Sequence, residues 1–182
     1  MPINPPDLLS LSRILIAPLF AYTLFRGHLF VSLFLFLFGA FSDLLDGFLA
    51  RRIGRGKYGY ILDPIGDRIL IGISLLSLHC VPLDKDISLL LVLFVVGQDL
   101  LLFPIGFYVS LLAIRRGNTL KASPLGKLTT LAQYSFVLYI LGINLLGIDT
   151  YVRPFELFVI LTSIASGVHH LYIWLRILRQ KA

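Results

Sequence analysis

The chain has 182 residues, of which 57% are hydrophobic and only 14% are charged. A soluble domain carries about 25% charged and about 45–50% apolar residues, so this composition excludes both an ordinary soluble globular protein and a disordered chain. The net charge of +6 comes from short basic segments between long apolar runs, which suits a membrane surface rather than a nucleic acid, and the single cysteine, Cys80, excludes a disulfide framework.

Six apolar segments follow one another along the chain, and each is long enough for a transmembrane helix, which needs about 20 residues. Their predicted ranges are 8–26, 29–50, 60–81, 87–114, 126–147 and 155–178. These segments take up most of the sequence. We therefore expect one all-α membrane domain of six transmembrane helices over residues 1–182, with no separate soluble domain.

Basic residues are distributed unequally between the two ends of these predicted helices. Eleven lie in the gaps after the second and fourth segments and at the C-terminal end, whereas three, Arg26, Lys85 and Arg153, lie in the opposite gaps. Because basic residues concentrate in cytoplasmic loops, we expect both termini to be cytoplasmic. A bacterial inner membrane is the simplest setting for such a protein.

Four aspartates lie where the second and third predicted helices approach their connection. Asp43 and Asp46 lie near the end of the second segment, and Asp63 and Asp67 lie near the start of the third. An ionised carboxylate at membrane depth costs a few kcal/mol, so such residues are usually functional. The four acids are therefore the first candidates for a site.

The spacing of the acids places each pair on one face of its helix. The first pair is at i and i+3, with Gly47 and Ala50 on the same stripe, and the second pair is at i and i+4. Antiparallel helices would bring four mutually repelling carboxylates together, so the pattern predicts divalent cations; oxygen ligands favour Mg²⁺, Mn²⁺ or Ca²⁺. Two ions about 3.5–4 Å apart can clamp a phosphoryl group, and the nearby Arg51 can bind its oxygens.

Two other interpretations of the aspartates remain open from the residues alone. Intramembrane acids also form cation or proton pathways, so an ion-coupled transporter is one alternative. A purely structural role in helix pairing is the other, although four acids on two facing stripes are hard to explain by packing.

The stretch from Asp43 to Asp67 resembles the signature of the CDP-alcohol phosphatidyltransferase family, D-x-x-D-G-x-x-A-R followed after a spacer by G-x-x-x-D-x-x-x-D. All eight fixed positions are present: Asp43, Asp46, Gly47, Ala50, Arg51, Gly59, Asp63 and Asp67. The spacer after Arg51 is one residue shorter than is usual in the family. Because it lies in the connection, we expect an altered loop rather than lost metal ligands.

The resemblance implies a membrane enzyme, usually a homodimer, that transfers a phosphatidyl group from CDP-diacylglycerol to an alcohol and releases CMP. It implies two metal ions, Mg²⁺ or alternatively Mn²⁺, held by Asp43, Asp46, Asp63 and Asp67. Asp67 is also the implied general base, which takes the proton of the acceptor hydroxyl. The implied CDP site consists of Asp43, Gly47, Ala50, Arg51 and Gly59.

The acceptor alcohol has to be inferred from the other segments. Residues 9–18 and 126–133 resemble both the phosphatidylglycerophosphate synthase branch, which uses glycerol-3-phosphate, and the cardiolipin synthase branch, which uses phosphatidylglycerol. The glycerophosphate branch typically has an Arg-Glu pair and a further Arg in its fourth span. This chain has Gln98 and Asp99 there, and no basic residue in 100–114. We therefore favour phosphatidylglycerol over glycerol-3-phosphate.

Three further residues are candidate contacts of the acceptor or its phosphate: Arg13, Asp99 and Lys127. Each also has a simpler interpretation. Arg13 can extend to the membrane interface, Lys127 can anchor the start of its helix, and Asp99 can form a hydrogen bond between helices.

Overall fold

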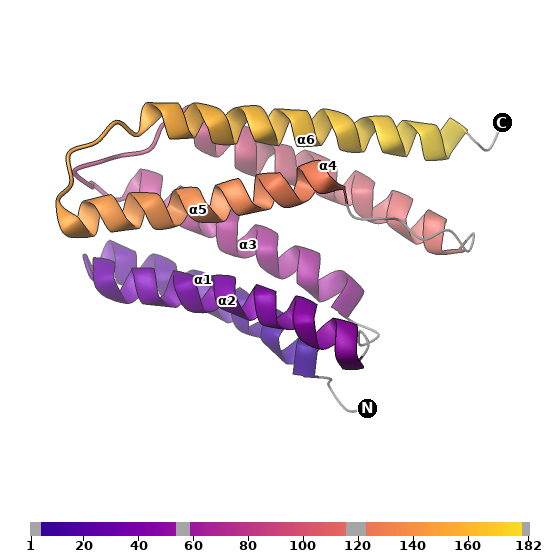
Figure 1. Cartoon of the computed structure of the whole chain (residues 1–182), viewed down its shortest axis with the longest axis horizontal. Coiled ribbons are helices and arrows are strands. Elements are labelled where there is room, and N and C mark those ends of the chain that lie inside the picture. Colours follow the sequence, from indigo (N-terminus) through magenta and orange to yellow (C-terminus); the bar gives the residue numbers. More distant parts are fainter. Residues whose placement is uncertain (1–4, 54–58, 116–122, 180–182) are drawn as a thin grey trace. The chain divides into compact units, whose positions relative to one another are not determined.

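The computed structural model describes the backbone of residues 5–53, 59–115 and 123–179, and the side chains of residues 11–42, 45, 65–109 and 123–176. The described residues form six α-helices and no strand: α1 (Pro5–Phe25), α2 (Leu29–Ile53), α3 (Gly59–Cys80), α4 (Leu89–Arg115), α5 (Pro124–Leu146) and α6 (Arg153–Arg179) (Figure 1). The all-α prediction is confirmed, and each predicted segment matches one helix to within three residues at either end.

Three described segments are long and apolar enough to cross a membrane: Leu89–Val109 in α4, all of α5, and Arg153–Arg176 in α6. Shorter apolar stretches occupy α1 and α2, at Leu11–Phe25 and Leu29–Ser42. Large apolar side chains remain on the surface of α4, where Leu100 and Leu101 are each 72% exposed. Such a surface is stable in lipid and unfavourable in water.

The chain divides into two compact units. The first comprises Met1–Ile87 and Val137–Tyr151, and the second comprises Ser88–Phe136 and Val152–Ala182. The C-terminal part of α5 thus belongs to the first unit and its N-terminal part belongs to the second.

In the first unit, α1 packs against both α2 and α3 (Figure 1). The rings of Phe20 and Phe36 are both fully buried and lie 5.8 Å apart. A Cβ atom added to Gly39 would lie 2.7 Å from Cδ2 of Leu70, so the glycine lets α2 approach α3 closely. This packing determines how α1 is placed relative to the two helices that carry the motif.

A tight turn reverses the chain between α1 and α2. Gly27 has φ of +76°, a conformation that glycine adopts without strain, and the N–H of His28 donates to the carbonyl of Thr23 at 2.9 Å. The hydroxyl groups of Thr23 and Ser32 are also 2.8 Å apart across the turn. Because α2 runs back along α1, the end of α2, where the motif begins, lies beside the start of α1.

Within the first unit, Asn144 of α5 forms hydrogen bonds to the connection between α3 and α4. Its Oδ1 accepts from the backbone N–H of Lys85 at 2.9 Å, and its Nδ2 donates to the carbonyls of Lys85 and Ile140 at 3.1 and 2.9 Å. Lys85 Nζ also donates to Asp149. This hydrogen bond holds the pKa of Asp149 below its ordinary value and raises the pKa of Lys85.

We expect Asn144→Leu to lower the free energy of unfolding by about 1–3 kcal/mol, because it leaves the N–H and C=O groups of Lys85 without these partners. Lys85→Met is the matched control, since it removes only the ion pair and keeps the backbone bonds to Asn144. Exposed ion pairs contribute little, so this control should unfold close to the wild type in a thermal scan. Equal losses in the two variants would show that the amide contacts are unimportant.

In the second unit, α4 packs against α6 through glycine positions. A Cβ atom added to Gly106 would lie 2.5 Å from Cζ2 of Trp174, and one added to Gly167 would lie 2.7 Å from Nε2 of Gln98. The same Nε2 atom donates to the backbone carbonyl of Ser163 at 2.8 Å. Small residues and interhelical hydrogen bonds of this kind are typical of helix pairs in membranes.

The N-terminal part of α5 is joined to α6 by two further polar contacts. Thr129 Oγ1 donates to the carbonyl of Thr162 at 2.9 Å, and Gln133 Nε2 donates to Ser163 Oγ at 3.3 Å. Ser163 thus accepts from one glutamine through its carbonyl and from another through its hydroxyl. Together with the bond from Gln98, these contacts pair polar groups of α4 and α5 with α6.

Candidate active site

The backbone places the aspartate motif at the adjoining ends of α2 and α3. The first pair, Asp43 and Asp46, lies in the second half of α2, and the second pair, Asp63 and Asp67, lies in the first half of α3. Each pair lies within one continuous helix, so its members share a helix face. Only residues 54–58 separate the two helices along the chain.

The side chains of most motif positions lie outside the described residues. This holds for three of the predicted metal ligands and for the predicted CDP contacts: Asp43, Asp46, Gly47, Ala50, Arg51, Gly59 and Asp63. Their roles stay predictions. Asp67 is the motif acid whose side chain is described.

Asp67 forms an ion pair with Arg13 of α1. Nη1 of Arg13 donates a hydrogen bond to Oδ1 of Asp67. The side chain of Arg13 is completely buried, whereas that of Asp67 is 28% exposed. A guanidinium group is costly to bury unless it is paired and hydrogen-bonded, so the contact explains how an arginine is accommodated inside this unit.

The pairing of Arg13 with Asp67 was not part of the sequence analysis. Arg13 shares a fully buried stripe of α1 with three apolar residues at helical spacing: Ala17, Phe20 and Leu24. This stripe is a signal in the sequence, because it places the arginine on the face that α1 buries. A buried cation needs an acidic partner, and the motif of a neighbouring helix supplies one.

The described side chains contain no group of three or more acidic, histidine or cysteine residues that could hold a metal ion. The predicted two-ion site would take three of its four carboxylates from positions outside that part. Asp67 fits such a site by its chemistry, because its carboxylate offers hard oxygen ligands and is partly accessible. The metal site stays a prediction.

The other two candidate acceptor contacts, Lys127 and Asp99, belong to the second unit. Lys127 is exposed in the first turn of α5, a helix that Ser123 caps by accepting the N–H of Gly126 at 3.3 Å. Asp99 is half-buried on α4, next to the Gln98 that binds α6. Both roles stay predictions.

His170 of α6 gives a structural reason for the glycine at position 126. Its Nδ1 lies 2.8 Å from the carbonyl of Ser166, one turn earlier on the same helix. The imidazole lies against the start of α5, where a Cβ atom added to Gly126 would be 3.1 Å from its Cε1. This contact links elements far apart in the chain, and the sequence analysis did not identify it.

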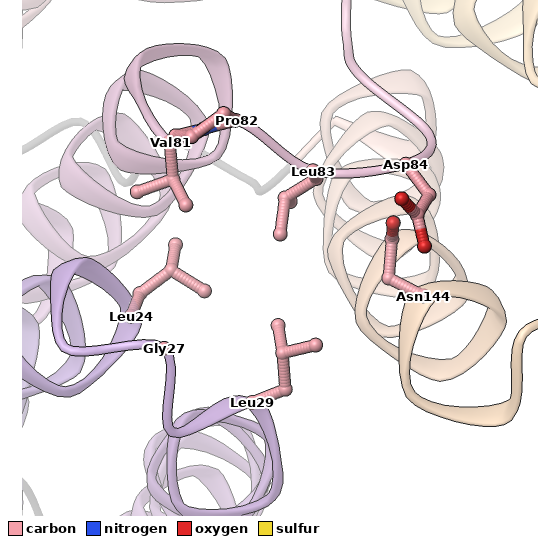
Figure 2. Close-up of a pocket in the computed structure, with 8 residues that line it drawn as sticks. All are labelled: Leu24, Gly27, Leu29, Val81, Pro82, Leu83, Asp84 and Asn144. Carbon is pink, nitrogen blue, oxygen red and sulfur yellow. The ribbon is translucent and has the colours of Figure 1, made fainter.

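A separate cavity of about 200 Å³ lies in the first unit. Figure 2 shows the residues that line it: Leu24, Gly27, Leu29, Val81, Pro82, Leu83, Asp84 and Asn144. Four apolar side chains point into the space, those of Leu24, Leu29, Val81 and Leu83, and the two polar ones lie at one edge (Figure 2). Leu24 follows Arg13 by three turns of α1, about 16 Å along the helix axis. The cavity is therefore remote from Asp67.

Comparisons with known proteins agree with the motif. The family model for CDP-alcohol phosphatidyltransferase matches residues 3–173. CDP-diacylglycerol–glycerol-3-phosphate 3-phosphatidyltransferase of Aquifex aeolicus is 37% identical over 129 residues, which cover 70% of each chain.

Cardiolipin synthases are also similar to this chain. The CMP-forming cardiolipin synthase of Rattus norvegicus is 37% identical over 106 residues, which cover 57% of this chain and 34% of the rat protein. A cardiolipin synthase and mitochondrial hydrolase fusion protein of Schizosaccharomyces pombe is 31% identical over 182 residues, covering 91% of this chain and 30% of the fusion. The matches thus span about a third of the length of these two relatives.

Proposed function

Because the chain belongs to the CDP-alcohol phosphatidyltransferase family, we propose that it transfers the phosphatidyl group of CDP-diacylglycerol to phosphatidylglycerol. CMP is the second product, and the lipid product is cardiolipin. The chain is thus an enzyme of phospholipid biosynthesis. Membership of this family favours phosphatidyl transfer over an ion-coupled transporter or a purely structural membrane protein.

The observation that supports phosphatidylglycerol is the scarcity of cations on α4. Gln98 donates a hydrogen bond to the carbonyl of Ser163 in α6, and the next residue is the acidic Asp99. Residues 100–114 contain no lysine or arginine. Glycerol-3-phosphate carries a dianionic monoester that needs several cationic donors. The phosphodiester of phosphatidylglycerol carries a single charge and needs fewer.

Glycerol-3-phosphate is the second candidate acceptor. It is supported by the Aquifex aeolicus relative, whose name specifies that acceptor and whose match covers 70% of both chains. In this case, cations outside α4 would have to bind the acceptor phosphate, and Lys127 is the foremost candidate.

In the proposed reaction, the acceptor hydroxyl oxygen bonds to the β-phosphorus of CDP-diacylglycerol. The bond from that phosphorus to the oxygen bridging to CMP breaks, and CMP leaves with the bonding electrons. Asp67 accepts the hydroxyl proton, and its partial exposure leaves the carboxylate accessible to a substrate. The proposed CDP contacts come from the same motif: Asp43, Gly47, Ala50, Arg51 and Gly59.

The proposed ligands of two Mg²⁺ or Mn²⁺ ions are the four motif carboxylates of Asp43, Asp46, Asp63 and Asp67. When bound, such ions would polarise the pyrophosphate and neutralise the charge of the departing CMP. Arg51 would add a fork of donors to phosphate oxygens.

We further propose six membrane-spanning helices, cytoplasmic termini, a cytoplasm-facing site and a homodimeric assembly. The three described segments with sufficient length and hydropathy support the spans. The basic residues at one end of the predicted helices support the orientation.

The test is a CMP-release assay on the purified full-length protein with CDP-diacylglycerol and Mg²⁺. Phosphatidylglycerol and glycerol-3-phosphate are supplied in parallel reactions, and the lipid products are identified by mass spectrometry. We expect CMP and cardiolipin with phosphatidylglycerol alone, and no CMP after chelation of the metal. Release of CMP with glycerol-3-phosphate alone would establish the second candidate. Absence of CMP with both acceptors would contradict the proposal.

A further inference from the structure

We propose that Arg13 is a positioning residue for Asp67, and that its guanidinium group holds the carboxylate in the orientation that proton transfer requires. The inference rests on the proposed function, because it takes Asp67 to be the general base. Its structural basis is the hydrogen-bonded ion pair between Nη1 of Arg13 and Oδ1 of Asp67. Nothing in the sequence motif itself includes Arg13.

The difference in burial between the two partners supports this assignment. Arg13 has no exposed side-chain surface, whereas Asp67 is 28% exposed. A residue that binds the phosphate of an acceptor has to present its donors to the substrate. Arg13 instead contacts the carboxylate from within the packing of α1 against α3, which suits a residue that acts through Asp67.

The position of Arg13 is well suited to orient a carboxylate. Arg13 is part of the buried stripe of α1 that includes Ala17 and Phe20, so its helix has little freedom to move. The χ2 torsion of an aspartate has a broad, shallow preference, which a planar guanidinium can narrow. A displacement of about 1 Å in a reacting group can cost about 10²-fold in rate.

The first experiment compares Arg13→Gln and Arg13→Lys with the wild type in the CMP-release assay. We expect Arg13→Gln to lower kcat about 10–100-fold and to change KM for either substrate little, as for other residues that orient a catalytic group. Arg13→Lys keeps the cation without the planar fork, so it should retain more activity. The matched control is Arg26→Gln, directly after the last residue of α1. Arg26 is exposed, and its Cζ lies 6.0 Å from the centroid of the Tyr22 ring.

The second experiment is a double-mutant cycle between Arg13→Gln and Asp67→Asn. If Arg13 acts through Asp67, the double variant should have the same kcat as Asp67→Asn alone. Independent, multiplicative losses would overturn the proposal. A raised KM for the acceptor with unchanged kcat would also overturn it, because that result assigns Arg13 to substrate binding.

Thermal unfolding of the wild type, the two single variants and the double variant gives a readout that needs neither activity nor metal. We expect the two substitutions to be coupled in stability, because Arg13→Gln removes the cation and Asp67→Asn removes the anion of the same ion pair. If Arg13→Gln does not fold, Arg13→Lys takes its place in both cycles. A wild type that releases no CMP overturns the proposed function, whereas independent effects in an active wild type overturn the role of Arg13 alone.

Discussion

Asp67→Asn is expected to lower the rate of CMP release by about 10²–10⁴-fold, the usual contribution of a positioned general base. Asparagine has nearly the same shape as aspartate, so the substitution tests the chemistry of the carboxylate rather than its volume. An amide oxygen can still accept the hydrogen bond from Arg13, which favours retention of the fold. The measurement is kcat with each acceptor, beside a thermal unfolding scan of the same preparation.

Asp84→Asn is the matched control for this prediction. Asp84 is an exposed acid of the same unit, and it lines the cavity that is remote from Asp67. The control changes the net charge by the same amount as Asp67→Asn but leaves the motif intact, so its kcat should remain close to the wild-type value. An Asp67→Asn variant that retains kcat within about threefold of the wild type would exclude Asp67 as the base.

Gly106→Ala is expected to lower the free energy of unfolding by about 1–3 kcal/mol, the usual cost of forcing extra volume into a packed contact. The added Cβ would lie 2.5 Å from Cζ2 of Trp174, and an indole ring cannot bend away as the end of a flexible side chain can. Either α4 or the tryptophan has to shift. The measurement is the unfolding midpoint in detergent, followed by the loss of helical circular dichroism.

Gly97→Ala on the same helix is the control for Gly106→Ala. In the described part of the chain, a Cβ atom at Gly97 would meet no neighbouring heavy atom within 4 Å. Alanine is the better helix former by about 1 kcal/mol, so this variant should be as stable as the wild type or slightly more stable. Replacing Trp174 by leucine in the Gly106→Ala background should restore part of the loss. Equal effects of the two alanine substitutions would contradict the close approach of α4 and α6.

The helices could be predicted from the sequence because apolar length is a local property. Each helix corresponds to a run of about 20 mostly apolar residues in the sequence. Turn residues such as Gly27 mark where the chain reverses. The predicted and observed ends of the helices differ by at most three residues. At helix ends the last turns extend into the polar segments, and α2 continues in this way through Arg51 and Arg52 to Ile53.

The candidate site could be predicted only where its residues are near one another in the chain. Asp67 was identified from the spacing of the motif, whereas its partner Arg13 precedes it by 54 residues. The contact of Gly106 with Trp174 likewise joins distant positions. Such pairs depend on which helix faces lie together, and the apolar residues that cover a membrane helix on all sides do not specify that.

The double role of Ser163 as an acceptor bears on how the protein is made. In the proposed membrane-spanning arrangement, the ribosome completes α4 and α5 before α6. The side chains of Gln98 and Gln133 would then reach the bilayer before the residue that receives their hydrogen bonds has been synthesised. Amide groups without partners are unfavourable in hydrocarbon. The unfinished helices would therefore gain by staying near water or the insertion machinery until the last helix arrives. A chain interrupted after α5 would expose these two glutamines, a feature by which quality control can recognise an unassembled membrane protein.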